Sequence, residues 1–249
     1  MTTGLDEWEG RLSRLHPAAA VTSVAVSGYL LTCMLFVGAG LMVTNRLGGL
    51  TRWDDSVVRW LADHRSSALN TWAGYATTLA DTLGIVVVLL ATTILLTVLR
   101  HRWEAFLLAV AVFLELTAFL TVNAVVARPR PDVARLGSLP STSSFPSGHT
   151  AAIVALYGGL AILASARLRH RVVGLVAWIA AFVATVAVGV ARVYRGMHHP
   201  SAVVAGALLG SAALAVAVVA VKVGQRAAAE RQRLHTPLAA SSPNLVAGR

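Results

Sequence analysis

The sequence predicts an all-α, polytopic membrane protein, a bundle of six spanning helices. Of its 249 residues, 56% are hydrophobic and 13% are charged, whereas charged residues make up about 25% of an ordinary globular chain. Six apolar runs approach the roughly 20 residues that a helix needs to cross the hydrocarbon core. Only the third of them contains an acidic or basic residue in its interior, Glu115. The runs cover residues 18–43, 83–99, 105–127, 151–166, 172–190 and 201–221.

The first run is predicted to be a retained membrane anchor. It is too long for the core of a signal peptide, and acidic residues are mixed with the arginines before it. We therefore expect three regions: a cytoplasmic N-terminal segment over residues 1–17, a six-helix transmembrane domain over 18–222, and a cytoplasmic tail over 223–249. The tail is rich in Ala, Arg and Ser without a sustained apolar face, so we expect it to be disordered.

An amphipathic helix is predicted between the first two spans. Trp53, Val57, Trp60 and Leu61 recur at helical spacing, and the residues on the other faces are charged. Such a stripe is typical of a helix that lies in the membrane interface, without a part in chemistry. The following segment, residues 69–82, is expected to extend the second spanning helix outward.

The arginines between the spans predict the topology, because positive residues collect on the cytoplasmic side of a membrane. They place both termini and the two connections near residues 100 and 170 in the cytoplasm. The connections 44–82, 128–150 and 191–200 then face outward from the cell membrane. This arrangement accounts for the formal charge of +10 better than nucleic-acid binding does, since the arginines are scattered over short loops.

The outward connection after the third span has the features of an anion site. Prolines at 129 and 131 end the third helix, and Ser147 can cap the fourth. The backbone N–H groups of Gly148 and His149 would then project from the positive end of a helix. Arg130, in the same loop, adds a guanidinium group that can bind two oxygens of one phosphate.

A second outward connection brings Arg192 and His198 to the same face. A phosphate monoester can be cleaved by a histidine that attacks phosphorus, while arginines neutralise the oxygens and a second histidine protonates the leaving oxygen. The two connections together supply every one of these groups. A two-metal site would need several convergent carboxylates, and these motifs contain only Asp132, so we expect neither a metal nor another cofactor.

Residues 50–222 resemble the type 2 phosphatidic acid phosphatase superfamily, the lipid phosphate phosphatases. The first motif of that family is a lysine, six residues, then Arg-Pro; Arg130 and Pro131 match it, while Asn123 stands at the lysine position. The second motif, Pro-Ser-Gly-His, is intact at residues 146–149.

The third motif of the family is Ser-Arg, five residues, His, three residues, Asp. Here it reads Ala191, Arg192, His198 and Ala202, so its serine and its aspartate are missing. The resemblance implies that His198 is the nucleophile and that His149 is the general acid. It also implies a phosphate cradle made of Arg130, Arg192, Ser147 and Gly148.

The missing aspartate would have oriented the nucleophilic imidazole, a role whose loss costs about 10⁴ in rate in a serine protease. A replacement carboxylate could come from Asp132, Asp81 or Glu115, and a backbone carbonyl could also fix the tautomer of His198.

Four further residues have open roles in the sequence. Asn123 can donate a hydrogen bond in place of the lysine, and Arg128 could supply its charge to the substrate. His199 either caps the turn before Pro200 or takes part in the site. Glu115 is either functional, as intramembrane acids often are, or bonded to a neighbouring helix.

The sequence therefore predicts an integral membrane phosphatase acting on a lipid phosphomonoester or diphosphate at the extracytoplasmic face, through a phosphohistidine intermediate. Its partner would be a phosphorylated membrane lipid such as phosphatidate, phosphatidylglycerol phosphate or a polyprenyl phosphate, and homo-oligomers are left open. Two alternatives remain: a catalytically impaired family member that only binds such lipids, and a membrane transporter.

Overall fold

The computed structural model describes residues 16–138, 142–167 and 170–235, and this part of the chain is helical apart from its connections. Six stretches are long and apolar enough to cross a membrane, which confirms the predicted all-α, six-span architecture. The helices are α2 (Pro17–Asn45), α3 (Gly48–Asp63), α4 (Ser67–Thr78), α5 (Thr82–Val98), α6 (Arg102–Val126), α7 (Gly148–Arg167), α8 (Arg171–Tyr194) and α9 (Pro200–His235).

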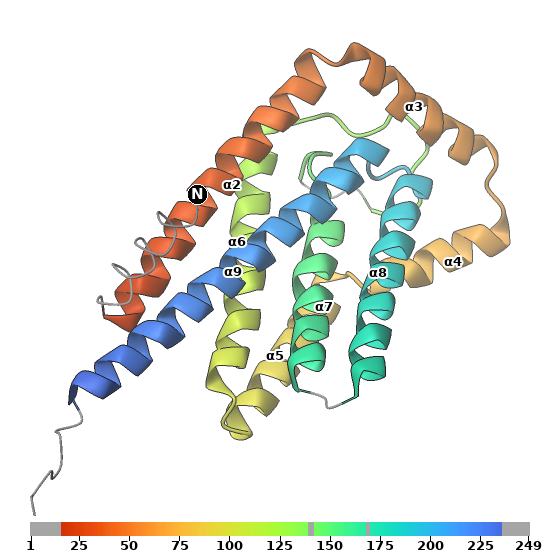
Figure 1. Ribbon diagram of the computed structural model, residues 1–249. Coiled ribbons are helices and arrows are strands. Elements are labelled where there is room, and N and C mark those ends of the chain that lie inside the picture. The colour runs from red at the N-terminus through yellow and green to blue at the C-terminus, as the bar shows by residue number, and fades with distance from the viewer. Residues whose placement is uncertain (1–15, 139–141, 168–169, 236–249) are drawn as a thin grey trace, which may run out of the picture.

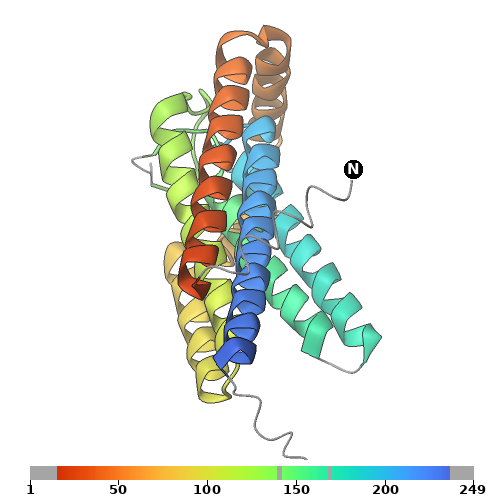
Figure 2. The same cartoon turned by 60° about the vertical axis from the view of Figure 1, so that its left-hand side comes forward.

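Helix α9 is the central helix of the bundle. It packs against α2 along most of its length, and also against α6 and α7 (Figures 1 and 2). The close approach depends on small residues, as is common between membrane helices. A methyl group added at Gly206 would overlap the carbonyl oxygen of Ser147, and one added at Gly210 would overlap that of Ala151. The backbone of α9 therefore rests on the first turns of α7.

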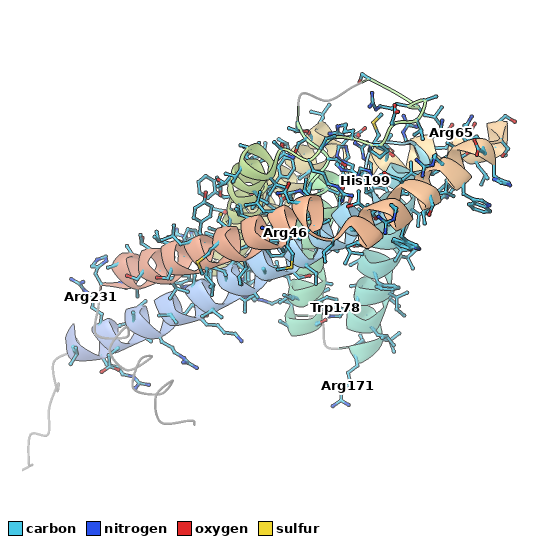
Figure 3. The ribbon with its side chains drawn as sticks, turned by 90° about the horizontal axis from the view of Figure 1, so that it is seen from above. Arg46, Arg65, Arg171, Trp178, His199 and Arg231 are labelled. Atoms are coloured by element: carbon cyan, nitrogen blue, oxygen red, sulfur yellow. The ribbon has the colours of Figure 1, made fainter. Side chains whose placement is uncertain are left out.

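The connections sort onto two ends of the bundle, as the arginine pattern predicts. The start of α2, the α5–α6 and α7–α8 turns and the end of α9 lie at one end (Figure 1). The α2–α3 connection, the 127–147 loop and the α8–α9 turn lie at the other, which we call the site end. Arg46 and Arg231 mark these two ends on the neighbouring helices α2 and α9 (Figure 3). That the site end faces out of the cell stays a prediction.

Helix α3 runs across the site end (Figure 1), where the sequence predicted an amphipathic helix. The face that it turns to the bundle differs from the expected apolar stripe. Trp53 and Trp60 are 53% and 59% exposed, whereas Asp54 is 0% and Val58 1% exposed. The reason is electrostatic, since Asp54 meets a buried arginine at the site end.

Two predicted boundaries need correction. The segment 69–82 does belong to the second spanning stretch, Ser67–Val98, but it is not a continuous extension of that helix, because α4 ends at Thr78 and a turn precedes α5; α4 packs against α8. The tail that was expected to be disordered from residue 223 continues α9 to His235. Its small apolar residues explain this, since Val223 and Ala227 pack against Ala20, Val21 and Val24 of α2. The segments 1–15 and 236–249 lie outside the described residues.

We expect Gly210→Ala to destabilise the bundle, because the added methyl group has no space beside the backbone of α7. Overpacking of this kind costs about 1–3 kcal/mol. The measurement is the thermal unfolding midpoint in detergent. Ser211→Ala, at the neighbouring exposed position, is the matched control, and equal midpoints for the two variants would contradict the packing described here.

Candidate active site

The loop after α6 is held in place by Asn123. Its side-chain amide donates to the carbonyl oxygens of Ser143 at 3.1 Å and Phe145 at 3.2 Å, and its oxygen accepts from the N–H of Ser143 at 2.9 Å. These bonds use both donors of the buried amide. Asn123 therefore anchors the loop and does not line the cavity described below, in contrast to the substrate-binding role expected from the sequence.

The α8–α9 turn returns the chain over the end of α8. Gly196 has a φ of +71°, in the left-handed region, and a β-carbon there would lie 2.7 Å from Cγ2 of Val133. The N–H groups of Met197 and His198 donate to the carbonyl oxygen of Arg192, at 3.0 and 3.3 Å. A glycine at this position therefore allows the reversal that brings His198 close to Arg192.

The loop, the turn and the start of α7 surround one cavity of about 310 Å³. It brings together both predicted histidines and both predicted arginines, although they come from three separate segments. Gly148 also lines it, and apolar residues of α5 and α6 form the rest of the wall. The polar members of the lining are Thr82, Glu115, Arg130, Thr142, His149, Arg192 and His198.

The two arginines of the cavity are held differently. Arg130 donates to carbonyl oxygens: its Nε and Nη2 to Thr142, its Nη2 also to Ser143, and its Nη1 to Met197. Arg192 is 5% exposed, and its buried Nε has no hydrogen-bond partner among the described residues. A buried guanidinium group without a partner is costly, so Arg192 is the side chain best placed to gain from a bound anion.

His198 is held as a neutral imidazole. Its Nδ1 lies 2.9 Å from the carbonyl oxygen of Ser144, which can only accept, so Nδ1 carries the proton. Burial lowers the pKa of His198 well below its ordinary value, and the neighbouring Arg192 and Arg130 lower it further. The ring therefore keeps an unprotonated Nε2. The hypothesis that a backbone carbonyl orients this histidine is confirmed.

Ser144 itself is fixed by a chain of contacts that reaches α3. Its N–H donates to the carbonyl oxygen of Arg128 at 2.8 Å, and its Oγ lies 3.1 Å from Nδ1 of His199. The Nε2 of His199 lies 3.2 Å from Oδ1 of Asp55. Burial and the charge of Arg128 lower the pKa of His199, so the neutral ring accepts from Ser144 and donates to Asp55.

Ser144 and Asp55 were not predicted from the sequence, and the role of His199 was left open. In Figure 3, His199 lies beside α3 at the site end. Its carbonyl oxygen does cap α9, accepting from the N–H groups of Ala202 at 3.0 Å and Val203 at 3.1 Å. The sequence contained one signal for a role of the His199 side chain: two adjacent acidic residues, 54 and 55, on the helix that was interpreted as a plain connector.

Three acids were candidates for orienting His198: Asp81, Asp132 and Glu115. Among the described residues, none of them forms a hydrogen bond or an ion pair with His198. Asp81 lies 3.6 Å from Nε2 of His149, the second histidine of the cavity. Asp132 is exposed. Glu115 lines the same cavity at its apolar wall.

Arg128 and Ser147 fall outside the cavity lining, contrary to their predicted place in substrate binding. Arg128 is 3% exposed; its Nη2 lies 2.8 Å from Oδ2 of Asp54, and its Nη1 donates to Ser201 at 2.8 Å. Ser201 also donates to Asp54 through its N–H and its hydroxyl group. Ser147 pairs with the hydroxyl group of Thr150 at 3.0 Å at the start of α7.

The cavity can therefore hold a phosphate-sized anion between two guanidinium groups, with an unprotonated imidazole nitrogen and a second histidine beside it. Within the described ranges, no three His, Cys, Asp or Glu side chains converge as metal ligands would. A larger groove of about 630 Å³ lies between α2 and α6 at the opposite end, lined by one histidine, one arginine and mainly apolar residues. It lacks the paired groups that phosphate chemistry requires.

Comparisons with known proteins agree with this fold. The PAP2 superfamily profile matches residues 87–226. The structure is similar to that of a transmembrane PAP2-type phosphatidylglycerolphosphate phosphatase from Bacillus subtilis, with a TM-score of 0.67 and 22% identity, over 78% of this chain and 94% of that one. It is also similar to Aquifex aeolicus LpxE, with a TM-score of 0.51 and 24% identity, over 67% and 93% of the two chains. Among curated protein sequences, none matches significantly.

We expect Asp54→Asn to destabilise the protein strongly, because it leaves the charge of Arg128 buried without a counter-ion. Breaking a buried pair from one side costs about 3–5 kcal/mol. Unfolding in detergent measures the effect, with Asp63→Asn, an exposed acid on the same helix, as the control. A loss no larger than that of the control would show that the pair does not hold α3 on the bundle.

Proposed function

This chain belongs to the PAP2 superfamily, and we propose that it is an integral membrane phosphatase that hydrolyses a lipid phosphomonoester or diphosphate through a phosphohistidine intermediate. The observation that carries the proposal is the convergence of His149, His198, Arg130 and Arg192 on one cavity. The surroundings of His198, Arg130 and Arg192 support a role in phosphoryl transfer, and Asp81 lies beside His149. The proposed roles are the ones that the motifs predicted.

In the first step, the unprotonated Nε2 of His198 attacks phosphorus. In a phosphomonoester, the bond from phosphorus to the lipid oxygen breaks, and that oxygen takes a proton from His149, so the lipid alcohol leaves; from a diphosphate, the leaving group is the lipid monophosphate. Arg192 and Arg130 neutralise the remaining phosphoryl oxygens as the charge on them redistributes. Removing one such stabilising group typically costs about 10² to 10³ in rate.

In the second step, a water molecule attacks the phosphorus of the phosphohistidine. His149, now unprotonated, takes a proton from the water, and the bond between phosphorus and His198 breaks. Inorganic phosphate leaves, and both histidines return to their starting state. Asp81, 3.6 Å from Nε2 of His149, provides a carboxylate beside the histidine that exchanges these protons.

His198 must keep one orientation through both steps. The carbonyl oxygen of Ser144 holds its Nδ1 proton, and His199 and Asp55 in turn hold the hydroxyl group of Ser144. This chain of contacts takes the orienting role that the aspartate of the third motif has in the family. It supports an active enzyme in preference to a family member that only binds its lipid.

The cavity also suits a substrate that remains anchored in the bilayer. Its arginines and histidines lie toward the site end, while its remaining wall is formed by apolar residues of the spanning helices α5 and α6, among them Ile85, Val86 and Val112. A phosphorylated headgroup can occupy the first part while the apolar tail stays among the helices and lipids. The distribution of arginines supports an extracytoplasmic position for this end in the cell membrane.

The first test is phosphate release by the detergent-purified protein from phosphatidate, phosphatidylglycerol phosphate and polyprenyl phosphates, with a chelator present. We expect release by the wild type, loss of at least 10³-fold in His198→Ala because the nucleophile is removed, and no inhibition by the chelator. Wild-type protein that binds these lipids but releases no phosphate would contradict the enzymatic proposal and favour a binding role.

The second test concerns the chain of contacts behind His198. We expect Ser144→Ala and Asp55→Asn each to lower kcat by about tenfold, the equivalent of one lost hydrogen bond of about 1.4 kcal/mol, without raising KM. The nucleophile loses its orientation, whereas the two arginines that bind phosphate are untouched. Asp63→Asn is the control; a rise in KM with unchanged kcat would assign these residues to binding instead.

A further inference from the structure

Glu115 is a buried acid that the proposed chemistry does not use. It lies in the middle of α6, is 2% exposed and lines the cavity that holds the two histidines. Within the described part of the chain, no hydrogen bond or ion pair joins its carboxyl group to another residue, and its oxygens are not among the fully enclosed atoms without a partner, so they face the cavity. The hydrogen bond to a neighbouring helix that the sequence left open is not made among these residues.

The surroundings of Glu115 make this absence costly. The nearby wall of the cavity is apolar and includes Ile85, Val112, Leu116 and Phe119. Buried polar groups in proteins are almost always hydrogen-bonded, and an acid within a membrane span generally faces a cavity or pathway where it meets a ligand. The missing partner of Glu115 is therefore expected in the contents of the cavity.

The distance of Glu115 from the phosphate end follows from helix geometry. The ring of Phe119 marks that end, because a β-carbon added at Gly148 would lie 2.9 Å from its Cε2 and Cζ atoms. Glu115 precedes Phe119 by one turn on the same face of α6, about 6 Å further along the axis. Since α6 runs toward the site end, Glu115 lies deeper in the membrane than the phosphate would.

We infer, on the basis of the proposed function, that Glu115 forms a subsite for the polar linkage region of a glycerol-based lipid phosphate. In such a lipid, the hydroxyl or ester group on the second glycerol carbon is only a few bonds from phosphorus, which places it about one helical turn below the phosphate. A hydroxyl group can donate to the carboxyl group, and an ester carbonyl can accept from its protonated form.

The same geometry disfavours polyprenyl phosphates. At the depth of Glu115 these lipids present only hydrocarbon, which would exclude water from the carboxyl group without giving it a hydrogen-bond partner. Discrimination of this kind is large when a site is built to bond a polar group that the competitor lacks. Glu115 is thus a specificity-determining residue, and the substrate class is glycerol-based.

The experiment compares kcat/KM for phosphatidate and for a polyprenyl phosphate in the wild type, Glu115→Gln and Glu115→Leu. We expect the wild type to prefer phosphatidate. Glu115→Leu should lower kcat/KM for phosphatidate by about ten- to a hundredfold while leaving or raising that for the polyprenyl phosphate. Glu115→Gln, which keeps the shape and both kinds of hydrogen bond, should retain most of the preference.

Val112→Ala, on the same apolar wall, is the matched control and should change both substrates by a similar factor. Equal losses on both substrates in Glu115→Leu and Glu115→Gln would overturn the inference, because they would give Glu115 a part in the chemistry or the fold. A wild type that prefers the polyprenyl phosphate would also overturn it. A wild type that hydrolyses neither lipid would instead contradict the proposed function itself.

Discussion

The site depends on how buried arginines are neutralised where the spanning helices end. Arg128 is paired with Asp54 and bonded to Ser201, and Arg130 is surrounded by carbonyl oxygens. Arg192 is about as buried as Arg128, yet its Nε has no partner among the described residues. Because an unpaired buried charge is far more costly than a paired one, the same residue type serves as structure at one position and, in the proposed function, as an anion site at another.

Helix α3 connects these two uses of charge. Its Asp54 pairs with Arg128 and so fixes the helix across the end of the bundle, while the adjacent Asp55 reaches His199 and, through Ser144, the proposed nucleophile His198. Adjacent residues on a helix point in different directions, which is why one acid can dock the helix and the other can act on the site. A segment that looks like a plain amphipathic connector is therefore part of the proposed catalytic arrangement.

Much of this was predictable from the sequence, because membrane spans and the cavity residues have local signals. Apolar length identifies the six spans, and short motifs identify His149, His198, Arg130 and Arg192. The roles of Asn123 and Arg128 were not predictable, since a side chain near a site can bind substrate or hold a loop, and only its partners decide between them. The helical continuation after residue 223 depends on contacts with α2, and the turn between α4 and α5 on packing against α8, which a local pattern does not contain.

Ala202 stands where the third motif of the family has an aspartate, and the fold retains part of the role of that aspartate. Ala202 is 0% exposed, and its carbonyl oxygen accepts from the N–H of Ser147 at 2.9 Å, so this position joins α9 to the start of α7. The carbonyl oxygen of Ser144 orients His198 as a carboxylate would, but it carries no full charge to stabilise a positively charged ring. In the proposed reaction, attack on phosphorus develops that positive charge beside a phosphoryl group that is itself negative. The proposed substrate can therefore supply the electrostatic part of the lost role, whereas orientation has to be built into the protein, and it is the orienting contact that the fold retains.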